Sequence, residues 1–154
     1  MTRVERLAKH IERTITGPQW HGPVLDYVLT GVTAEQAAAR PIAGAHSIWE
    51  LVLHIAAWAE IARARLDGRA TADPPPDVDW PPVPDASAQE WEAALHRMRE
   101  SHRDLAVRVR QLSESALDEK IVGLEYATWY LLHGVVEHSA YHGGQIMMLR
   151  KALS

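Results

Sequence analysis

The chain has 154 residues, of which 47% are hydrophobic and 23% charged, and its formal net charge is −4. These values fit one globular domain, expected over residues 1–154, and the mild negative charge without a long Lys/Arg cluster argues against a nucleic-acid partner. The absence of cysteine excludes disulfides, thiolate zinc ligands and a cysteine nucleophile, and no apolar run approaches the length of a membrane span, so a cytoplasmic protein is expected.

The first third of the chain predicts one long helix and two short ones. Apolar residues recur at helical spacing over 3–16, and the Gly-Pro pair that follows should end this helix. A short helix is expected next, and Thr33–Gln36 has the form of a capping box that opens one further turn. His21 and His46 lie near the expected helix ends, where a solvated or capping role is the ordinary one.

The second long helix is predicted over 47–67. Ser47 and Glu50 have the spacing of a capping box, and Gly68 should end the helix. His54 interrupts its seam of apolar residues and should therefore point into the core. By itself, such a histidine either hydrogen-bonds a partner across the core or binds a ligand.

A proline-rich crossover should separate the second and third long helices. Residues 70–85 contain six prolines and are expected to be extended, without regular structure. The third helix is predicted from Ser87 to about Leu112. His96 and His102 in this helix are six residues apart and do not share a face, so both are expected on the surface.

The last helix, predicted over 130–154, carries the strongest chemical signal. His138 and His142 replace apolar residues of its seam and lie one turn apart, so both imidazoles should point into the core. Each could hydrogen-bond a partner there, but an unpaired buried polar group costs roughly 1–3 kcal/mol, and a divalent metal would satisfy both. With His54, three imidazoles from two facing helices form a ligand set. Such a set suits Zn²⁺, Ni²⁺, Fe²⁺ or Cu²⁺ and leaves a coordination position open, as in catalytic sites.

Two side chains are candidates for orienting these imidazoles, because a metal-bound histidine usually donates its second N–H to a partner. Glu50 lies one turn before His54, although it also serves the capping box. Gln145 follows His142 by three residues and could instead contribute only to packing.

Four long amphipathic segments without alternating runs predict an all-α four-helix bundle with a long proline-rich crossover between helices two and three. Its histidine pair lacks the glutamate of an H-E-x-x-H zinc protease, which excludes that class. The sequence also lacks the Glu-x-x-His pairs of di-iron bundle proteins.

Two stretches, HSIWELVLHIAAW at 46–58 and HSAYHGGQI at 138–146, resemble the DinB / YfiT-like family of metal-dependent enzymes. The resemblance implies a four-helix bundle with up-down-down-up topology, commonly homodimeric, whose metal triad falls on His54, His138 and His142. It also implies a transferase or isomerase that uses a low-molecular-weight thiol such as bacillithiol or mycothiol. Many family members have Arg where this chain has Gly143, which would remove a charge near the site.

Three functions follow from these observations. The first is thiol-dependent transfer or isomerisation with zinc or nickel, or with iron. The second is hydrolysis by metal-activated water, and the third is a non-catalytic metal-binding or stress protein. Thiol chemistry ranks above hydrolysis because no Asp or Glu on the last helix shares the inward face of His138 and His142 to act as a base. Six tryptophans are more than one small core needs, which favours a homodimer with a small-molecule substrate.

Overall fold

Every regular element of the computed structural model, which describes residues 1–154, is a helix. The elements are α1 (Arg3–Ile15), α2 (Leu25–Leu29), α3 (Ala34–Ala38), α4 (Ile48–Leu66), α5 (Pro76–Asp79), α6 (Ala88–Arg110), the 3₁₀ helix η1 (Ser115–Asp118) and α7 (Thr128–Ala152). The all-α class predicted from the sequence is confirmed: α2 and α3 are the two short helices that were expected beside the four long ones, and α5 is an additional short helix.

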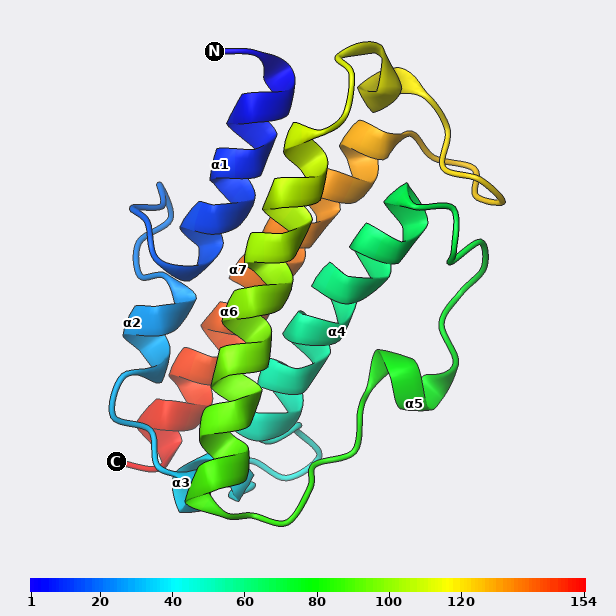
Figure 1. Cartoon of the computed structure of the whole chain (residues 1–154). Coiled ribbons are helices and arrows are strands. Elements are labelled where there is room, and N and C mark those ends of the chain that lie inside the picture. The colour runs from blue at the N-terminus through cyan, green and yellow to red at the C-terminus, as the bar shows by residue number, and fades with distance from the viewer.

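The four long helices pack around a common core. Helix α4 packs against α6 and α7, and α1 packs against the same two helices. In Figure 1 the chain descends through α1, rises through α4 and again through α6, and descends through α7. The segment between α4 and α6 passes outside the bundle and carries α5.

Local capping explains where the helices begin and end. At the start of α4, Ser47 Oγ accepts the Glu50 N–H, and a Glu50 carboxylate oxygen accepts the Ser47 N–H at 2.7 Å, which completes the predicted capping box. Thr33 and Gln36 form the same reciprocal pair before α3. Gly68 follows α4 with φ of +69°, a conformation that glycine adopts without steric cost.

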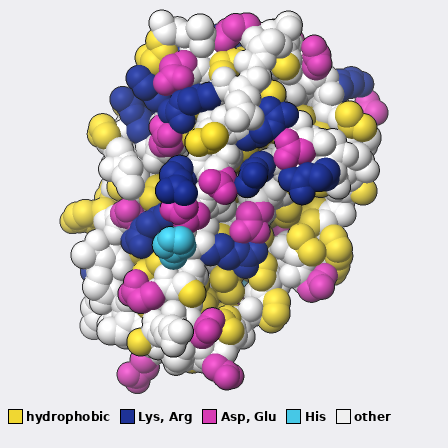
Figure 2. All heavy atoms as spheres, viewed as in Figure 1, with side chains coloured by type: hydrophobic (Ala, Val, Ile, Leu, Met, Phe, Trp, Pro, Cys, Tyr) yellow, Lys and Arg dark blue, Asp and Glu magenta, His cyan; other side chains and the backbone are white.

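Ion pairs between helices cover the outer face of the bundle. Arg97 of α6 contacts Glu60 of α4, and Arg110 of α6 contacts Glu12 of α1, each with an N–O distance of 2.7 Å. Figure 2 shows basic and acidic side chains interspersed over this face. Exposed pairs of this kind contribute little stability each, so the core carries the fold.

The core consists of two apolar clusters with a polar layer between them. One cluster draws on α2, α3, the first halves of α4 and α6, and the end of α7. The other draws on α1, the later parts of α4 and α6, η1 and the start of α7. The polar layer consists of His54 from α4, Ser101 and His102 from α6, and His138, Ser139 and His142 from α7.

One histidine prediction is wrong. His102 was expected on the surface, but it is fully buried in the polar layer. Met98, Leu105 and Val109 precede and follow it at heptad-like spacing and are also fully buried, so His102 occupies a core position of α6. His96 is exposed, as expected.

The crossover is more ordered than its prolines suggested. Residues 70–85 were expected to lack regular structure, but Pro76 begins the single helical turn α5, with Pro75 as the preceding cap. Proline is tolerated in the first turn of a helix because the amide hydrogen it lacks would be unpaired there. None of the helices is both long enough and apolar enough to cross a membrane.

Candidate metal centre

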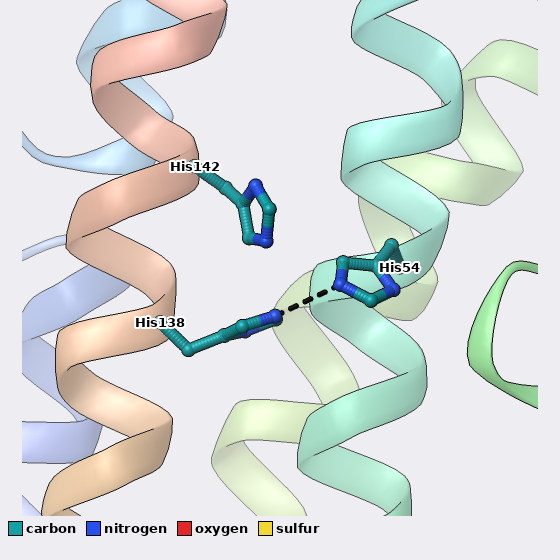
Figure 3. A group of neighbouring side chains, drawn as sticks. All are labelled: His54, His138 and His142. Atoms are coloured by element: carbon teal, nitrogen blue, oxygen red, sulfur yellow. Dashed lines mark hydrogen bonds between the residues drawn. The ribbon is translucent and has the colours of Figure 1, made fainter. Parts of the chain in front are cut away.

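Three imidazoles from two helices meet at the centre of the polar layer. His138 and His142 project from successive turns of α7 toward His54 of α4 (Figure 3). The Nε2 atoms of His54 and His138 are 3.0 Å apart, and one ring nitrogen from each of the three residues lies within 4.8 Å of the others. The structure therefore brings the predicted set together.

The ring of His54 is held in one tautomer by the crossover. Its Nδ1 lies 2.6 Å from the backbone oxygen of Asp79. A carbonyl oxygen can only accept, so Nδ1 carries the proton and donates it. In the neutral ring Nε2 is then a bare lone pair, and it faces the other imidazoles.

His142 is held in the same way by its own helix. Its Nδ1 lies 2.6 Å from Oε1 of Gln145, three residues later in α7. Donation of the Nδ1 proton to the amide oxygen leaves the Nε2 lone pair of His142 unprotonated. Gln145 thus has the contact that the sequence suggested for it.

His138 is the unsatisfied member of the group. Its Nδ1 is buried and has no hydrogen-bond partner, while its Nε2 faces the Nε2 of His54. Two facing lone pairs repel each other unless a proton or a metal ion lies between them. The contact between two imidazole nitrogens, in a half-buried side chain whose other nitrogen has no partner, is one that a bound ion would account for.

All three imidazoles are held neutral by their surroundings. Burial lowers the pKa of His54 and of His142, although the bonds to Asp79 and Gln145 partly oppose this effect. Burial, followed by the neighbouring imidazoles, lowers the pKa of His138 to about 3. Neutral imidazoles are the form that binds metals at neutral pH.

The donor set fits a divalent transition metal. Two nitrogens bound to one ion at 2.0–2.1 Å lie about 2.9–3.4 Å apart, a range that includes the 3.0 Å between His54 and His138. Two of the three rings already direct Nε2 inward through a partner on Nδ1. The residues present are therefore suited to such an ion.

The crossover supplies residues that sequence reasoning missed. Asp79 Oδ1 accepts the indole N–H of Trp58 at 2.7 Å and lies 3.3 Å from Nδ1 of His54. Trp80 stacks between His54 and His46, with ring centroids 3.7 Å from each. These contacts join residues far apart in the chain, and the only sequence signal was an Asp-Trp pair among prolines.

The contacts of two residues, Glu50 and Gly143, differ from those expected from the sequence. Glu50 was a candidate partner for His54, but its carboxylate accepts the Ser47 N–H and pairs with Arg40, so its contacts lie at the start of α4. Gly143 was expected near the site. A Cβ atom at this position would lie 3.5 Å from Cδ2 of Leu25 in α2.

A pocket of about 310 Å³ opens beside His138, between α4, the first turns of α7, the crossover that follows α4 and the segment that precedes α7. Its lining includes the aromatic rings of Trp58, Tyr126 and Tyr130, and of the three histidines it includes His138.

Comparison with known proteins matches the chain to a family. A family model described as the DinB superfamily matches residues 19–146, a stretch that contains all three histidines. No curated protein and no solved structure gave a significant match.

Proposed function

The chain belongs to the DinB superfamily, and from this premise we propose that it holds one divalent transition metal ion and catalyses transfer or isomerisation with a low-molecular-weight thiol. His54, His138 and His142 are the proposed ligands. The observation that carries this proposal is the fixed tautomer of two rings, which directs both Nε2 atoms toward the nitrogen of His138.

Zinc and nickel suit an all-imidazole set best, and iron is the next candidate. When bound, such an ion acts as a Lewis acid that lowers the pKa of the group in its open position. The chain's own residues orient the site: Asp79 and Gln145 fix two of the rings, and Trp80 covers one face of His54.

Thiol chemistry remains the first choice over hydrolysis because no carboxylate forms an ion pair or hydrogen bond with the inward nitrogens of the three histidines. Asp79, which belongs to the crossover and not to the last helix, approaches the site from the Nδ1 side of His54, opposite the inward Nε2. Its Oδ1 also accepts the indole N–H of Trp58. Asp79 is therefore suited to orienting His54, and not to accepting a proton from water at the centre.

In the proposed transfer, the sulfur of an external thiol attacks an electrophilic carbon of the substrate. The S–C bond forms as the leaving group departs with its electron pair, and the thiol proton passes to solvent. The thiol comes from solution because the chain has no cysteine. Hydrolysis is the alternative reaction, and non-catalytic metal binding is the alternative without a reaction.

The proposal extends to the architecture. One domain over residues 1–154 with an up-down-down-up bundle agrees with the helix directions in Figure 1. A homodimer is supported by exposed apolar side chains along one helix. They are Trp129, Tyr130, Tyr141 and Met148 of α7.

The test is to supply an activated aryl halide to metal-loaded protein, with and without a small thiol, and to measure halide release together with thioether formation. His142→Ala measures the background reaction. We expect turnover that requires both the thiol and His142. Turnover without thiol would favour hydrolysis, and metal binding without turnover across thiols and electrophiles would favour the non-catalytic alternative.

A further inference from the structure

Arg65, near the end of α4, is a buried cation without an acidic partner. Only 4% of its surface is exposed. Its Nη1 donates to the hydroxyl of Tyr126 at 2.6 Å and its Nη2 to the backbone oxygen of Ala72 at 3.3 Å, whereas Nε is buried and has no acceptor. A buried charge is costly unless it is paired, so this side chain requires an explanation.

The neighbouring arginines show the usual arrangement. Arg63 pairs with Asp104, and Arg69 pairs with Asp67, all at the surface. Arg65 forms no such pair. The acidic residue that shares its pocket, Asp73, is exposed and makes no ion pair with it.

Arg65 and His138 line the same pocket of about 310 Å³. The ring of Trp58 joins them: its centroid lies 5.3 Å from the guanidinium carbon of Arg65 and 5.8 Å from the ring of His138. Tyr126 and Tyr130 add further aromatic surface to the lining. The pocket therefore has a cation and an imidazole of the proposed metal centre in its walls, with aromatic surface between them.

We propose that this pocket binds a small anionic substrate with a planar apolar body, and that Arg65 binds its carboxylate or an equivalent acid. The neutral hydroxyl and carbonyl acceptors of Arg65 leave its charge available to such a group. The aromatic walls suit the apolar body, and the end of the pocket at His138 suits the reacting atom. This inference names the substrate class and rests on the proposed function of the histidine site.

Arg65 also has a structural role, because its two hydrogen bonds tie α4 to the crossover and to the segment before α7. A loss of binding in a variant would not by itself distinguish the two roles. Selectivity for charge does, because a structural role gives no preference between an anion and its neutral isostere.

The experiment uses 2-naphthoate and the uncharged 2-naphthamide as probes. Their binding to metal-free protein is measured by calorimetry and by tryptophan fluorescence, so that neither probe can bind a metal ion. Hydrogen bonds between charged groups contribute more free energy than hydrogen bonds to a neutral group. We therefore expect the parent protein to bind the acid about 10- to 100-fold more tightly than the amide. Equal affinities, or a preference for the amide, would overturn the proposal.

Variants then assign the preference to Arg65. Arg65→Met should abolish it, whereas Arg63→Met, which removes the same charge from the exposed face of α4, should retain it. If Arg65→Met does not fold, Arg65→Lys replaces it as the test, because lysine keeps the positive charge. The Arg65→Lys protein should still bind the acid more tightly than the amide. Preference retained in Arg65→Met, or lost equally in Arg63→Met, would contradict the assignment.

The two proposals can fail separately. Acid-selective binding through Arg65 in a protein that takes up no metal would overturn the metal centre alone. A protein that binds metal through the three histidines but shows no preference for the acid would overturn this inference alone.

Discussion

The polar layer of the bundle contains histidines in two different states. On the α4 side, His54, His138 and His142 face one another, and a pocket opens beside them. On the α6 side, His102 contacts Ser139 and is fully buried. His138 and Ser139 are adjacent in α7. His138 belongs to the group of three histidines, and Ser139 contacts His102.

The difference lies in how the ring nitrogens are satisfied. Nδ1 of His102 donates to the backbone oxygen of Met98 at 2.9 Å, and its Nε2 lies 3.2 Å from the hydroxyl of Ser139. Both nitrogens of His102 therefore have partners within the protein. His138 has one nitrogen without a partner and another that faces a second imidazole nitrogen. His102 is fully buried and His138 only partly, so the unsatisfied nitrogens, and not the depth of burial, distinguish the candidate ligand from the core histidine.

The largest expected effect is loss of the metal when His138 is replaced by alanine. Even partners that only orient a ligand contribute 10- to 100-fold to affinity, so removal of a ligand should weaken binding by more than about 100-fold. Elemental analysis of tag-free protein should fall from near one equivalent per chain to a trace. His133→Ala, which removes an exposed histidine of the same helix, is the control. Unchanged metal content in His138→Ala would mean that the three histidines are not the ligands.

The second prediction concerns His102 and the free energy of unfolding at acid pH. Burial lowers the pKa of His102 to about 4 from an ordinary value of 6.5. Between these values the unfolded chain binds a proton that the folded protein refuses, so the free energy of unfolding falls as pH falls from about 6.5 to about 4. A shift of this size is worth about 3 kcal/mol at 1.36 kcal/mol per pKa unit.

Urea unfolding of the metal-free protein at several pH values tests this prediction. The proposed ligands also have lowered pKa values, so the parent should lose stability in acid for more than one reason. His102→Gln isolates one residue: the stability difference between parent and variant should shift by about 3 kcal/mol between pH 7 and pH 4. His96→Gln, at an exposed site, should show no such change. A pH-independent difference for His102→Gln would show that His102 is charged in the folded state or accessible to solvent.

The third prediction separates a metal that serves chemistry from one that holds the fold. A ligand that binds only the folded state, at 100 times its dissociation constant, adds about 2.7 kcal/mol. For a chain of this size, chelation should lower the melting temperature by about 5–10 °C. The helical circular dichroism signal at 25 °C should remain, because both apolar clusters pack independently of the histidines. Loss of that signal on chelation would make the metal structural.

Sequence reasoning succeeded where local patterns decide the outcome. The capping box of Ser47 and Glu50 located the start of α4, and helical spacing placed His54, His138 and His142 on inward faces. His102 was misassigned because the spacing to His96 showed only that the two do not share a face. Its position between buried apolar residues of α6 would have identified it as a core residue.

The contacts of the crossover could not be predicted in the same way. Asp79 reaches His54 across 25 residues, through a segment whose prolines favour no particular path. Neither helical periodicity nor capping signals apply to such a contact. The orientation of the rings, which carries the proposed function, therefore depends on tertiary structure.

The smallest expected effect separates the two residues that the sequence offered as partners for the imidazoles. Gln145→Ala removes the acceptor for Nδ1 of His142, so that ring can rotate or change tautomer, and metal affinity should fall about tenfold. Glu50→Ala removes half of a capping box and should lower stability by about 1 kcal/mol while metal affinity stays unchanged. Metal titration and thermal melts of both variants measure the two quantities side by side. Equal losses of affinity would mean that Glu50 reaches the site through the start of α4; no loss in Gln145→Ala would mean that packing alone fixes the ring of His142.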